Sequence, residues 1–281
     1  MVCFLKEKHD LTVAQACKAS GLSRSSYYRP LIDWRKKDGA VITALNTIVK
    51  KHSRWGFWKC YDSLRLKGRP WNHKRVHRVY CKLGLNQVRR TKKRLPNREV
   101  VSLEVIRKPN VMWAMDFMHD TLYNGRCFRT LNVLDEGVRE CLAIEVDTSL
   151  PAERVLRVLN QLKEERPLPQ QIRLDNGPEF VSRKLAQWAE ENNVKLAFTQ
   201  PGKPTQNAYI ERFNRTYREE VLNAHLFHDL DQVREITWLW MNDYNEERPH
   251  NATDRIPPTH YRKRIEEKLK QLENSTLELS A

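Results

Sequence analysis

The sequence predicts an all-α region followed by an α/β domain with a mixed five-stranded sheet and flanking helices. Three observations support this division. Basic residues are concentrated in the first 110 residues, helical patterns with glycine stops fill the first 90, and strands alternate with helices from about residue 111. A chain of 281 residues is long enough for one large domain or two modest ones.

The charge distribution favours a polyanionic partner. The formal net charge is +15, and residues 1–110 hold 27 Lys and Arg against 7 Asp and Glu. Such an excess is the electrostatic footprint of a nucleic-acid-binding region, although a basic surface kept for solubility has the same composition. We see no apolar run of about 18 residues and no signal peptide, so we expect a cytoplasmic protein without a membrane anchor. The six scattered cysteines contain no CxxC pair and are expected to be reduced thiols.

Residues 1–90 are predicted to form a helical DNA-binding region. Residues 13–19 and 23–28 have helix-turn-helix spacing, with Ser23 as the cap of the second helix. A second helical unit is expected from helices at 41–52, 57–66 and 73–83. On its last helix, basic side chains lie largely off the apolar face, where they can contact DNA: Lys74, Arg75 and Arg78.

Residues 91–110 are predicted to be a basic linker, 111–265 a catalytic core and 266–281 a C-terminal tail. Strands are expected at 111–122, 127–136 and 140–148, and Asn124-Gly125 marks a hairpin between the first two. A helix at 152–165, a strand at 170–176, a helix at 182–192, a strand at 195–200 and a helix at 206–222 follow. This element order is that of a ribonuclease-H-like domain.

Three acids occupy positions that suit a metal site. Asp116 lies within an apolar strand, where Asp is depleted and costly to bury. Asp175 ends a parallel-type strand, and Asn176-Gly177 turns the chain directly after it. Glu211 lies one turn into a helix that begins after the loop 201–206. Phosphoryl transfer by two metal ions needs such carboxylates on rigid supports.

Alternatives exist for each of these roles. Asp116 can be a paired structural acid, and four other carboxylates lie near enough in the sequence to compete as ligands: Asp120, Asp135, Glu140 and Glu179. A zinc site from His73, His77 and Cys81 has the right helical spacing. However, it lacks a fourth ligand unless Cys60 supplies one.

Four sequence segments resemble the orfB-encoded catalytic protein of insertion-sequence-three group transposases, in the DDE transposase and retroviral integrase superfamily. They are WAMDFMHD around Asp116, DNGPEF from Asp175, PGKPTQNAYIERFN ending at Asn214, and YNEERPHNAT from Tyr244. Thirty-five residues separate Asp175 from Glu211, which is the spacing expected for the family. The front half also resembles the family's helical region, for example in HSRWGFWKCYDSLRLKGRPWNHKRVHRVYCKLGL.

The resemblance implies a bacterial transposase, associated with the nucleoid, that binds terminal inverted repeats and cleaves and joins DNA strands. It implies that Asp116, Asp175 and Glu211 are the catalytic triad and hold two Mg²⁺ ions, with Mn²⁺ as a substitute. Double-stranded DNA, as element end and as target, is the expected partner of a homo-oligomer that can be fused to, or paired with, the product of an upstream reading frame. Further DNA contacts are expected on or near the catalytic helix, from Lys203, Arg212, Arg215 and Arg218.

Two other functional classes fit parts of the sequence. A ribonuclease-H-like nuclease or resolvase would hydrolyse DNA without joining it. A non-catalytic DNA-binding regulator would use only residues 1–90, and its activity would not depend on Asp175.

Overall fold

The structure is a computed structural model that describes residues 1–29, 33–86, 107–200 and 207–279. Lys203 lies outside these ranges, and so does most of the predicted basic linker, residues 91–106. None of the helices in the described ranges is both long and apolar enough to cross a membrane.

A five-stranded mixed sheet forms the centre of the α/β domain, as predicted. Its strands are β1 (Met112–Thr121), β2 (Cys127–Asp135), β3 (Cys141–Asp147), β4 (Gln171–Leu174) and β5 (Lys195–Phe198). The order is β3-β2-β1-β4-β5, in which β1 pairs antiparallel with β2 and parallel with β4. The hairpin turn after β1 contains Gly125 at φ 81°, a conformation that glycine adopts without strain.

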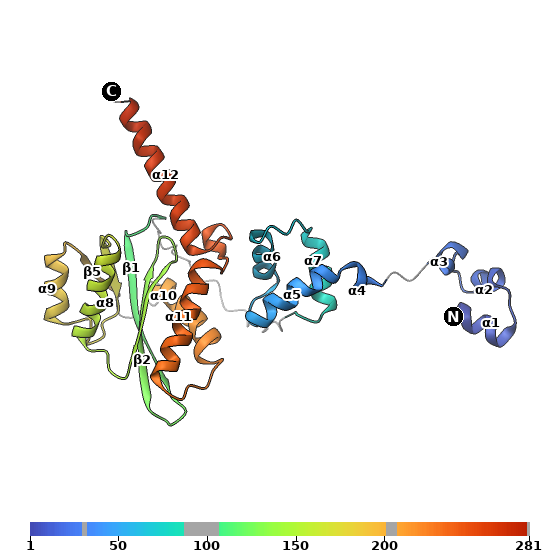
Figure 1. Cartoon of the computed structure of the whole chain (residues 1–281), viewed down its shortest axis with the longest axis horizontal. Helices are drawn as coiled ribbons and strands as arrows, with labels where there is room; N and C mark the ends of the chain where they lie inside the picture. Colours follow the sequence, from blue (N-terminus) through green and yellow to red (C-terminus); the bar gives the residue numbers. More distant parts are fainter. Residues whose placement is uncertain (30–32, 87–106, 201–206, 280–281) are drawn as a thin grey trace.

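Helices cover both faces of the sheet (Figure 1). Alternate residues of β1 point to opposite faces, so Trp113 and Met115 pack in one cluster with helices α8 (Ala152–Glu165) and α9 (Arg183–Glu191). Ala114 packs on the other face with α10 (Ala208–Tyr217) and α11 (Leu230–Glu246). The chain after α10 continues as a π-helical turn, η2 (Arg218–Leu222). Asp116 belongs to the same alternate set as Ala114 and therefore faces α10.

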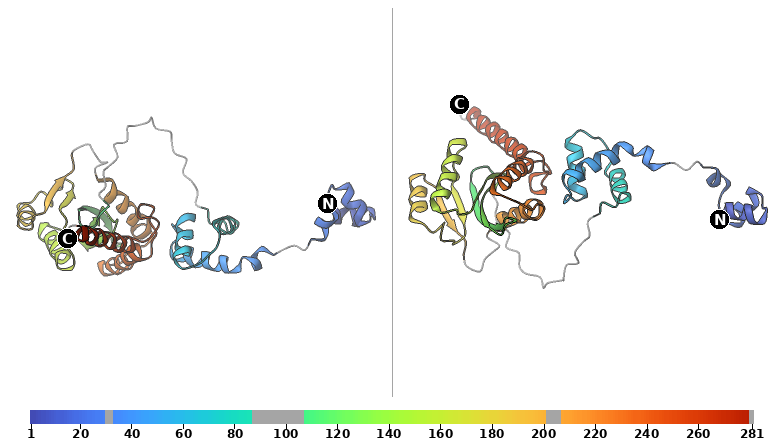
Figure 2. Two further views of the ribbon diagram at one scale, coloured as in Figure 1. Left: turned by 90° about the horizontal axis from the view of Figure 1, so that it is seen from above. Right: turned by 60° about the horizontal axis from the view of Figure 1, so that its bottom comes forward.

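Two small helical units precede the sheet and lie one after the other on its α11 side (Figures 1 and 2). The first contains α1 (Val2–His9), α2 (Val13–Ala19) and α3 (Arg24–Tyr28). Ser23 caps α3 as predicted, because its hydroxyl accepts a hydrogen bond from the Ser26 backbone N at 3.2 Å. The second contains α4 (Trp34–Lys37), α5 (Gly39–Lys51), α6 (Phe57–Leu66) and α7 (His73–Lys82), which pack around a core that includes Leu45, Trp55 and Tyr80.

Ion pairs join the second helical unit to the α/β domain. Lys51, at the end of α5, pairs with Asp243 of α11 at 2.7 Å and with Glu247 at 3.4 Å. Arg255 pairs with Asp62 of α6 at 3.6 Å and lies over the Trp58 ring at 5.1 Å. The last helix, α12 (Pro258–Leu279), follows a 3-10 turn, η3 (Asn251–Thr253), and runs without a break through the predicted domain boundary at residues 265 and 266.

Candidate functional site

The first predicted acid, Asp116, lies in the middle of β1 and faces α10. Its Oδ1 accepts a hydrogen bond from the Phe117 backbone N at 2.9 Å, and its Oδ2 accepts one from Asn214 Nδ2 at 2.7 Å. Asn132, directly opposite Asp116 on β2, donates from Nδ2 to Asn214 Oδ1 at 2.6 Å. The side-chain amides of Asn132 and Asn214 therefore hold the Asp116 carboxylate against α10, and neither of them carries a positive charge.

The second predicted acid, Asp175, follows β4 at the edge where that strand ends. In the parallel pair Ala114 lies beside Arg173, so continuing the register by two residues brings Asp175 beside Asp116. Neighbouring strands are about 4.8 Å apart. Asp116 and Asp175 therefore lie on neighbouring strands at the level where β4 ends.

The loop after Asp175 is held on three sides. Gly177 N donates to Asp175 Oδ1 at 3.0 Å, and Asn176 Nδ2 donates to the Thr199 carbonyl at 2.9 Å, beyond β5. Phe180 is buried and stacks on Phe117 with ring centroids 4.7 Å apart. A Cβ on Gly177 would lie 3.0 Å from Asp175 Oδ1, so close approach, rather than a positive φ, explains the glycine.

The third predicted acid, Glu211, lies in the first turn of α10. With Asp116 it lines an open hollow of about 510 Å³, to which Phe117, Met118, His119, Asn214, Arg215 and Arg218 also contribute. We call this site the acidic hollow. Glu211, Arg215 and Arg218 recur at four and seven residues on α10 and its extension, so they share the face that lines it.

The charges of Asp175 and Glu211 act on the Asp116 carboxylate. Burial, together with these two charges and against the lowering effect of its two hydrogen bonds, raises the pKa of Asp116 to about 6. No basic side chain in the described ranges forms an ion pair with any of the three acids. Within those ranges no cation of the protein relieves their repulsion, which is the situation of carboxylates that bind a cation.

The competing carboxylates are all engaged in the fold. Glu179 pairs with Arg129, which holds the pKa of Glu179 below its usual range, and Asp120 pairs with Arg218 at 3.5 Å. Glu140 is bound by two arginines, Arg166 at 3.2 Å and Arg262 at 2.9 Å.

Asp135 is 1% exposed and accepts hydrogen bonds from three backbone N–H groups, those of Asn110, Gly137 and Val138. None of the four competing acids is thus as free to bind a ligand as Asp116, Asp175 and Glu211.

The predicted DNA contacts are not equivalent in the structure. Arg75 and Arg78 both bind Asp38, which is fully buried, through Nε at 2.8 Å and Nη2 at 2.7 Å. They therefore hold the α4–α5 junction to α7, and only Lys74 of the three is exposed without an ion-pair partner in the described ranges. Their contact with DNA stays a prediction.

The cations on α10 also differ from one another. Arg215 pairs neither with Glu211 nor with Glu219 within the described ranges, whereas Arg218 donates to the His119 carbonyl at 2.9 Å. Arg212 does not line the acidic hollow; it lines a separate pocket on the other side of the helix.

Asn214 and Asn132 are the site residues that the sequence reasoning missed. Two features of the sequence point to them. Asn214 is three residues after Glu211 and therefore next to it on the helix surface, and Asn132 is a polar residue in an otherwise apolar strand.

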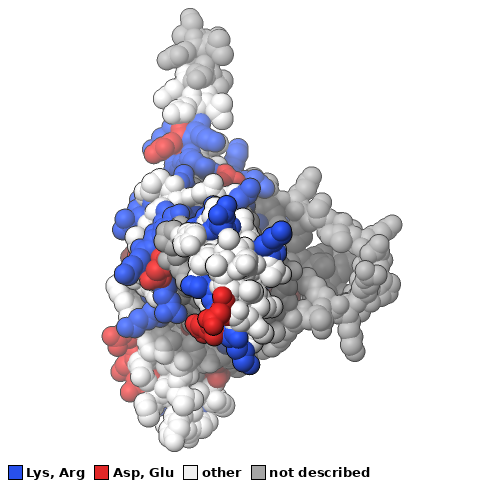
Figure 3. Space-filling view, turned by 90° about the vertical axis from the view of Figure 1, so that its right-hand side faces the viewer, with Lys and Arg blue, Asp and Glu red and all other residues white. Residues whose placement is uncertain are grey.

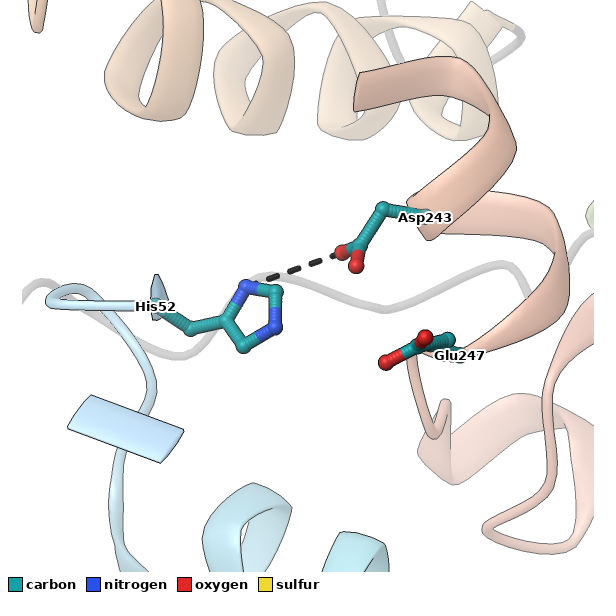
Figure 4. A group of neighbouring side chains, drawn as sticks. All are labelled: His52, Asp243 and Glu247. Carbon is teal, nitrogen blue, oxygen red and sulfur yellow. Dashed lines mark ion pairs between the residues drawn. The ribbon is translucent and has the colours of Figure 1, made fainter. Parts of the chain in front are cut away.

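The zinc alternative finds no support in the geometry. Cys81 Sγ lies 3.7 Å from His77 Nε2, but Cys60 is buried and donates to the Trp55 carbonyl. Among the described residues, a single group of three side chains has ligand atoms all within 4.8 Å of one another. It consists of His52, Asp243 and Glu247 (Figure 4). Lys51 already binds both carboxylates of that group, so it is a salt-bridge cluster at the domain joint.

The segment from Tyr244 to His250 braces the domain. Asn245 Oδ1 accepts from the Cys141 backbone N at 2.9 Å, and Asn245 Nδ2 donates to the Cys141 carbonyl at 2.8 Å. Arg248 is 4% exposed and pairs with Glu220. These contacts hold the edge strand β3 and the turn η2 to the end of α11.

Comparison with known families divides the chain as the structure does. The Integrase core domain family matches residues 106–204, and a second family of the same description matches residues 192–258. The HTH-like domain family matches residues 36–94. It therefore covers the second helical unit, whereas the helix-turn-helix spacing at residues 13–28 lies outside the match.

Two insertion-element proteins are similar to most of this chain. The chain is 37% identical to the insertion element IS407 uncharacterized 31.7 kDa protein of Burkholderia multivorans, over 92% of each chain. It is 36% identical to the insertion element IS476 uncharacterized 39.2 kDa protein of Xanthomonas euvesicatoria, over 91% of this chain and 73% of that protein. The catalytic core domain of HTLV-2 integrase in complex with magnesium superposes with a TM-score of 0.46 and 17% identity, over 55% of this chain and 97% of that one.

Sheet order, the matched domain families and similarity to an insertion-element protein over 92% of each chain agree with the sequence motifs. The chain belongs to the insertion-sequence transposases of the orfB type in the insertion-sequence-three group, with an HTH-like domain followed by an integrase core of ribonuclease-H-like fold.

Proposed function

We propose that this chain binds the terminal inverted repeats of its element through its helical region and cleaves and joins DNA strands at the acidic hollow. Asp116, Asp175 and Glu211 are the proposed catalytic residues. The observation that carries the proposal is the contrast between these three acids, which have no cationic partner in the described ranges, and the competing acids, which are engaged in the fold.

The donor set fits divalent cations. Mg²⁺ prefers carboxylate oxygens and retains several waters, so three carboxylates supply enough protein ligands. The three acids do not gather within 4.8 Å of one another, as the His52 group does, and a site for two ions about 3.5–4 Å apart does not require it. Two bound Mg²⁺ ions, or Mn²⁺ in their place, would activate the attacking oxygen and stabilise the leaving oxygen.

The chain's own side chains position these groups and the DNA. Asn214 orients the Asp116 carboxylate, and the loop held by Asn176 and Gly177 presents Asp175. Arg215 lies on the Glu211 face, where its guanidinium can bind a backbone phosphate of the strand in the hollow. Cleavage frees a 3′ hydroxyl, which then attacks a second phosphodiester in line, without a covalent protein intermediate.

The N-terminal helices supply the expected DNA surface. Figure 3 looks at the molecule from the side on which these helices lie, and Lys and Arg cover more of that view than Asp and Glu do. We expect a homo-oligomer to hold two element ends at once, as strand transfer between ends requires.

The test compares acids of the two kinds in the same assay. Asp116→Asn, Asp175→Asn and Glu211→Gln should each lower Mg²⁺-dependent cleavage of a labelled duplex carrying the inverted repeats that flank the gene by orders of magnitude. DNA binding, measured by fluorescence anisotropy, should persist. The matched controls, Glu179→Gln and Asp120→Asn, should retain cleavage within about tenfold because these acids serve the fold.

Each alternative has its own outcome. Cleavage without joined product, in a strand-transfer assay, would identify a nuclease or resolvase. If Asp175→Asn cleaves DNA at the wild-type rate, the proposed catalytic site is wrong.

A further inference from the structure

A second pocket lies on the other side of α10 from the acidic hollow. It has a volume of about 290 Å³ and collects basic side chains from four parts of the chain: Lys59 on α6, Arg139 between β2 and β3, Arg212 on α10 and Arg248 after α11. Aromatic rings of Tyr209, Phe213 and Tyr244 form much of its remaining wall. We call this site the basic pocket.

The positive charge of the basic pocket is not balanced by its own lining. No Asp or Glu occurs among the described residues that line it. Glu220 pairs with Arg248 from outside the lining, and this leaves Lys59, Arg139 and Arg212 without an ion-pair partner in the described ranges. Arg139 Nη1 and Arg248 Nε are buried without a hydrogen-bond partner. Buried donors of this kind ordinarily find an acceptor, so a ligand that brings acceptor oxygens would satisfy them.

The pocket's basic groups are also held in place. The Arg139 guanidinium lies over the Tyr209 ring at 3.5 Å, which restrains its plane while its N–H groups remain available. Burial, followed by the charges of Arg248 and Arg212, lowers the pKa of Lys59 to about 8. Burial and the same arginines, together with Lys59, hold the pKa of His250 well below its usual range. Both groups experience a positive potential that an anion would relieve.

The position of the pocket suggests which anion it takes. Arg212 follows Glu211 on α10, so one helix, about 10 Å thick, separates the basic pocket from the acidic hollow. Successive phosphates of a strand advance about 3.4 Å along a duplex axis. A strand whose reacting phosphate lies in the acidic hollow therefore places another phosphate, a few nucleotides away, within reach of the basic pocket.

We propose that the basic pocket binds a backbone phosphate of the DNA strand being processed, and that Lys59 and Arg139 are its principal contacts. This inference rests on the proposed function. Because Lys59 belongs to the second helical unit and the other cations to the integrase core, the bound phosphate would join the two domains across α10.

The experiment measures binding, so that its result is independent of cleavage. Lys59→Gln and Arg139→Gln are titrated against a short fluorescein-labelled duplex in buffer without divalent cations. Each variant should lose about tenfold in affinity, and the slope of log affinity against log salt should fall by about one. The control is Lys184→Gln, which removes the same charge from α9, where Lys184 is exposed and pairs with Glu153. It should bind as the wild type does.

A position-specific test uses duplexes with one uncharged methylphosphonate linkage at a time. One linkage, a few nucleotides from the cleaved bond, should weaken the wild type, and Lys59→Gln should be insensitive at that same linkage. Equal sensitivity of both proteins at every linkage would overturn the proposal. So would wild-type affinity and salt slope in both variants.

Two further readings separate the remaining explanations. Lys59→Gln should unfold at the same temperature as the wild type or higher, because it removes a charge that burial disfavours; loss of binding through misfolding would instead lower that temperature and overturn the assignment. Inorganic phosphate that raises the melting temperature of the wild type but not of Lys59→Gln, with unchanged DNA affinity, would make this a free-anion site and exclude the DNA contact. If Asp116→Asn still cleaves DNA, the proposed catalytic function is refuted. That outcome does not bear on the basic pocket, because the pocket is tested by DNA affinity and not by cleavage.

Discussion

The Asp38 cluster allows a direct measurement of what Arg75 and Arg78 do. In the wild type, Arg75 Nε donates to Asp38 Oδ1 at 2.8 Å and Arg78 Nη2 donates to Asp38 Oδ2 at 2.7 Å. Asp38→Asn keeps the shape of the side chain but leaves one acceptor oxygen for these two guanidinium groups. A hydrogen bond between charged groups contributes about 1.5–3 kcal/mol. The arginine side chains are 39% and 44% exposed, so water can replace part of what is lost. We therefore expect Asp38→Asn to lower the free energy of unfolding by about 2 kcal/mol.

The pH dependence of this loss has a definite sign. Burial alone would raise the pKa of Asp38, but the two arginines outweigh it, and its pKa lies below the ordinary value of 3.8. The ionised carboxylate therefore stabilises the fold above that value, and the stabilisation is lost as the pH falls through the lowered pKa. The gap between wild type and Asp38→Asn should be complete at neutral pH and should close at strongly acid pH.

The assay is urea unfolding followed by tryptophan fluorescence, since Trp34, Trp55 and Trp71 belong to or pack on the core of the same helical unit. Asp33→Asn is the matched control. Asp33 caps α4 through a hydrogen bond from the Arg35 backbone N at 2.9 Å, and Asn caps a helix equally well. If Asp38→Asn unfolds within about 0.5 kcal/mol of the wild type, the arginines do not stabilise this unit, and their predicted role in DNA binding becomes the better explanation of both.

Two further predictions concern the integrase core. Gly177→Ala should slow Mg²⁺-dependent cleavage by about ten- to a hundredfold, because its Cβ would displace the Asp175 carboxylate; Gly56→Ala, which meets no atom within 4 Å, should leave cleavage unchanged in the same assay. Asp135→Asn should become less destabilising as the pH rises from about 4 to 6. Burial raises the pKa of Asp135 to about 6, so the folded wild type binds more protons than the unfolded chain and loses up to about 3 kcal/mol of stability over this range. Urea unfolding of both proteins across that range measures the difference, and a gap that widens with pH would contradict the raised pKa.

The strands and their succession along the chain were predictable because strand patterns are local. Apolar residues from Met112 to Met118 fill both faces of β1, and the hairpin at Asn124-Gly125 fixes the first antiparallel pair. The helix at 152–165 was predicted at its observed bounds because its apolar residues recur with helical spacing. The sheet edge that brings Asp175 beside Asp116 then follows from parallel pairing of β4 with β1.

Pairings between distant elements were not predictable from these patterns. The sequence marks Arg75 and Arg78 as cations off the apolar face of a helix, but the partner, Asp38, lies 37 and 40 residues earlier. Whether a cation faces solvent or a buried carboxylate depends on how α7 rotates against α5, which the periodicity of either helix leaves open. The same holds for Lys59, whose burial depends on the contact between the helical unit and the α/β domain.

The helix α10 shows how far periodicity alone can go. Successive residues of a helix are rotated by about 100°, so residues four and seven positions after Glu211 return to its face. Arg215 and Arg218 do line the acidic hollow with Glu211, as that spacing predicts. Arg212 is expected from the sequence to contact DNA because it lies on the same helix, but the rotation of one residue turns it towards the basic pocket. Because of this rotation, α10 lines both sites, with Arg212 in the basic pocket and Glu211 in the acidic hollow. A phosphate bound by the proposed contacts of the basic pocket can therefore help to position the Glu211 carboxylate on the opposite side of the same helix.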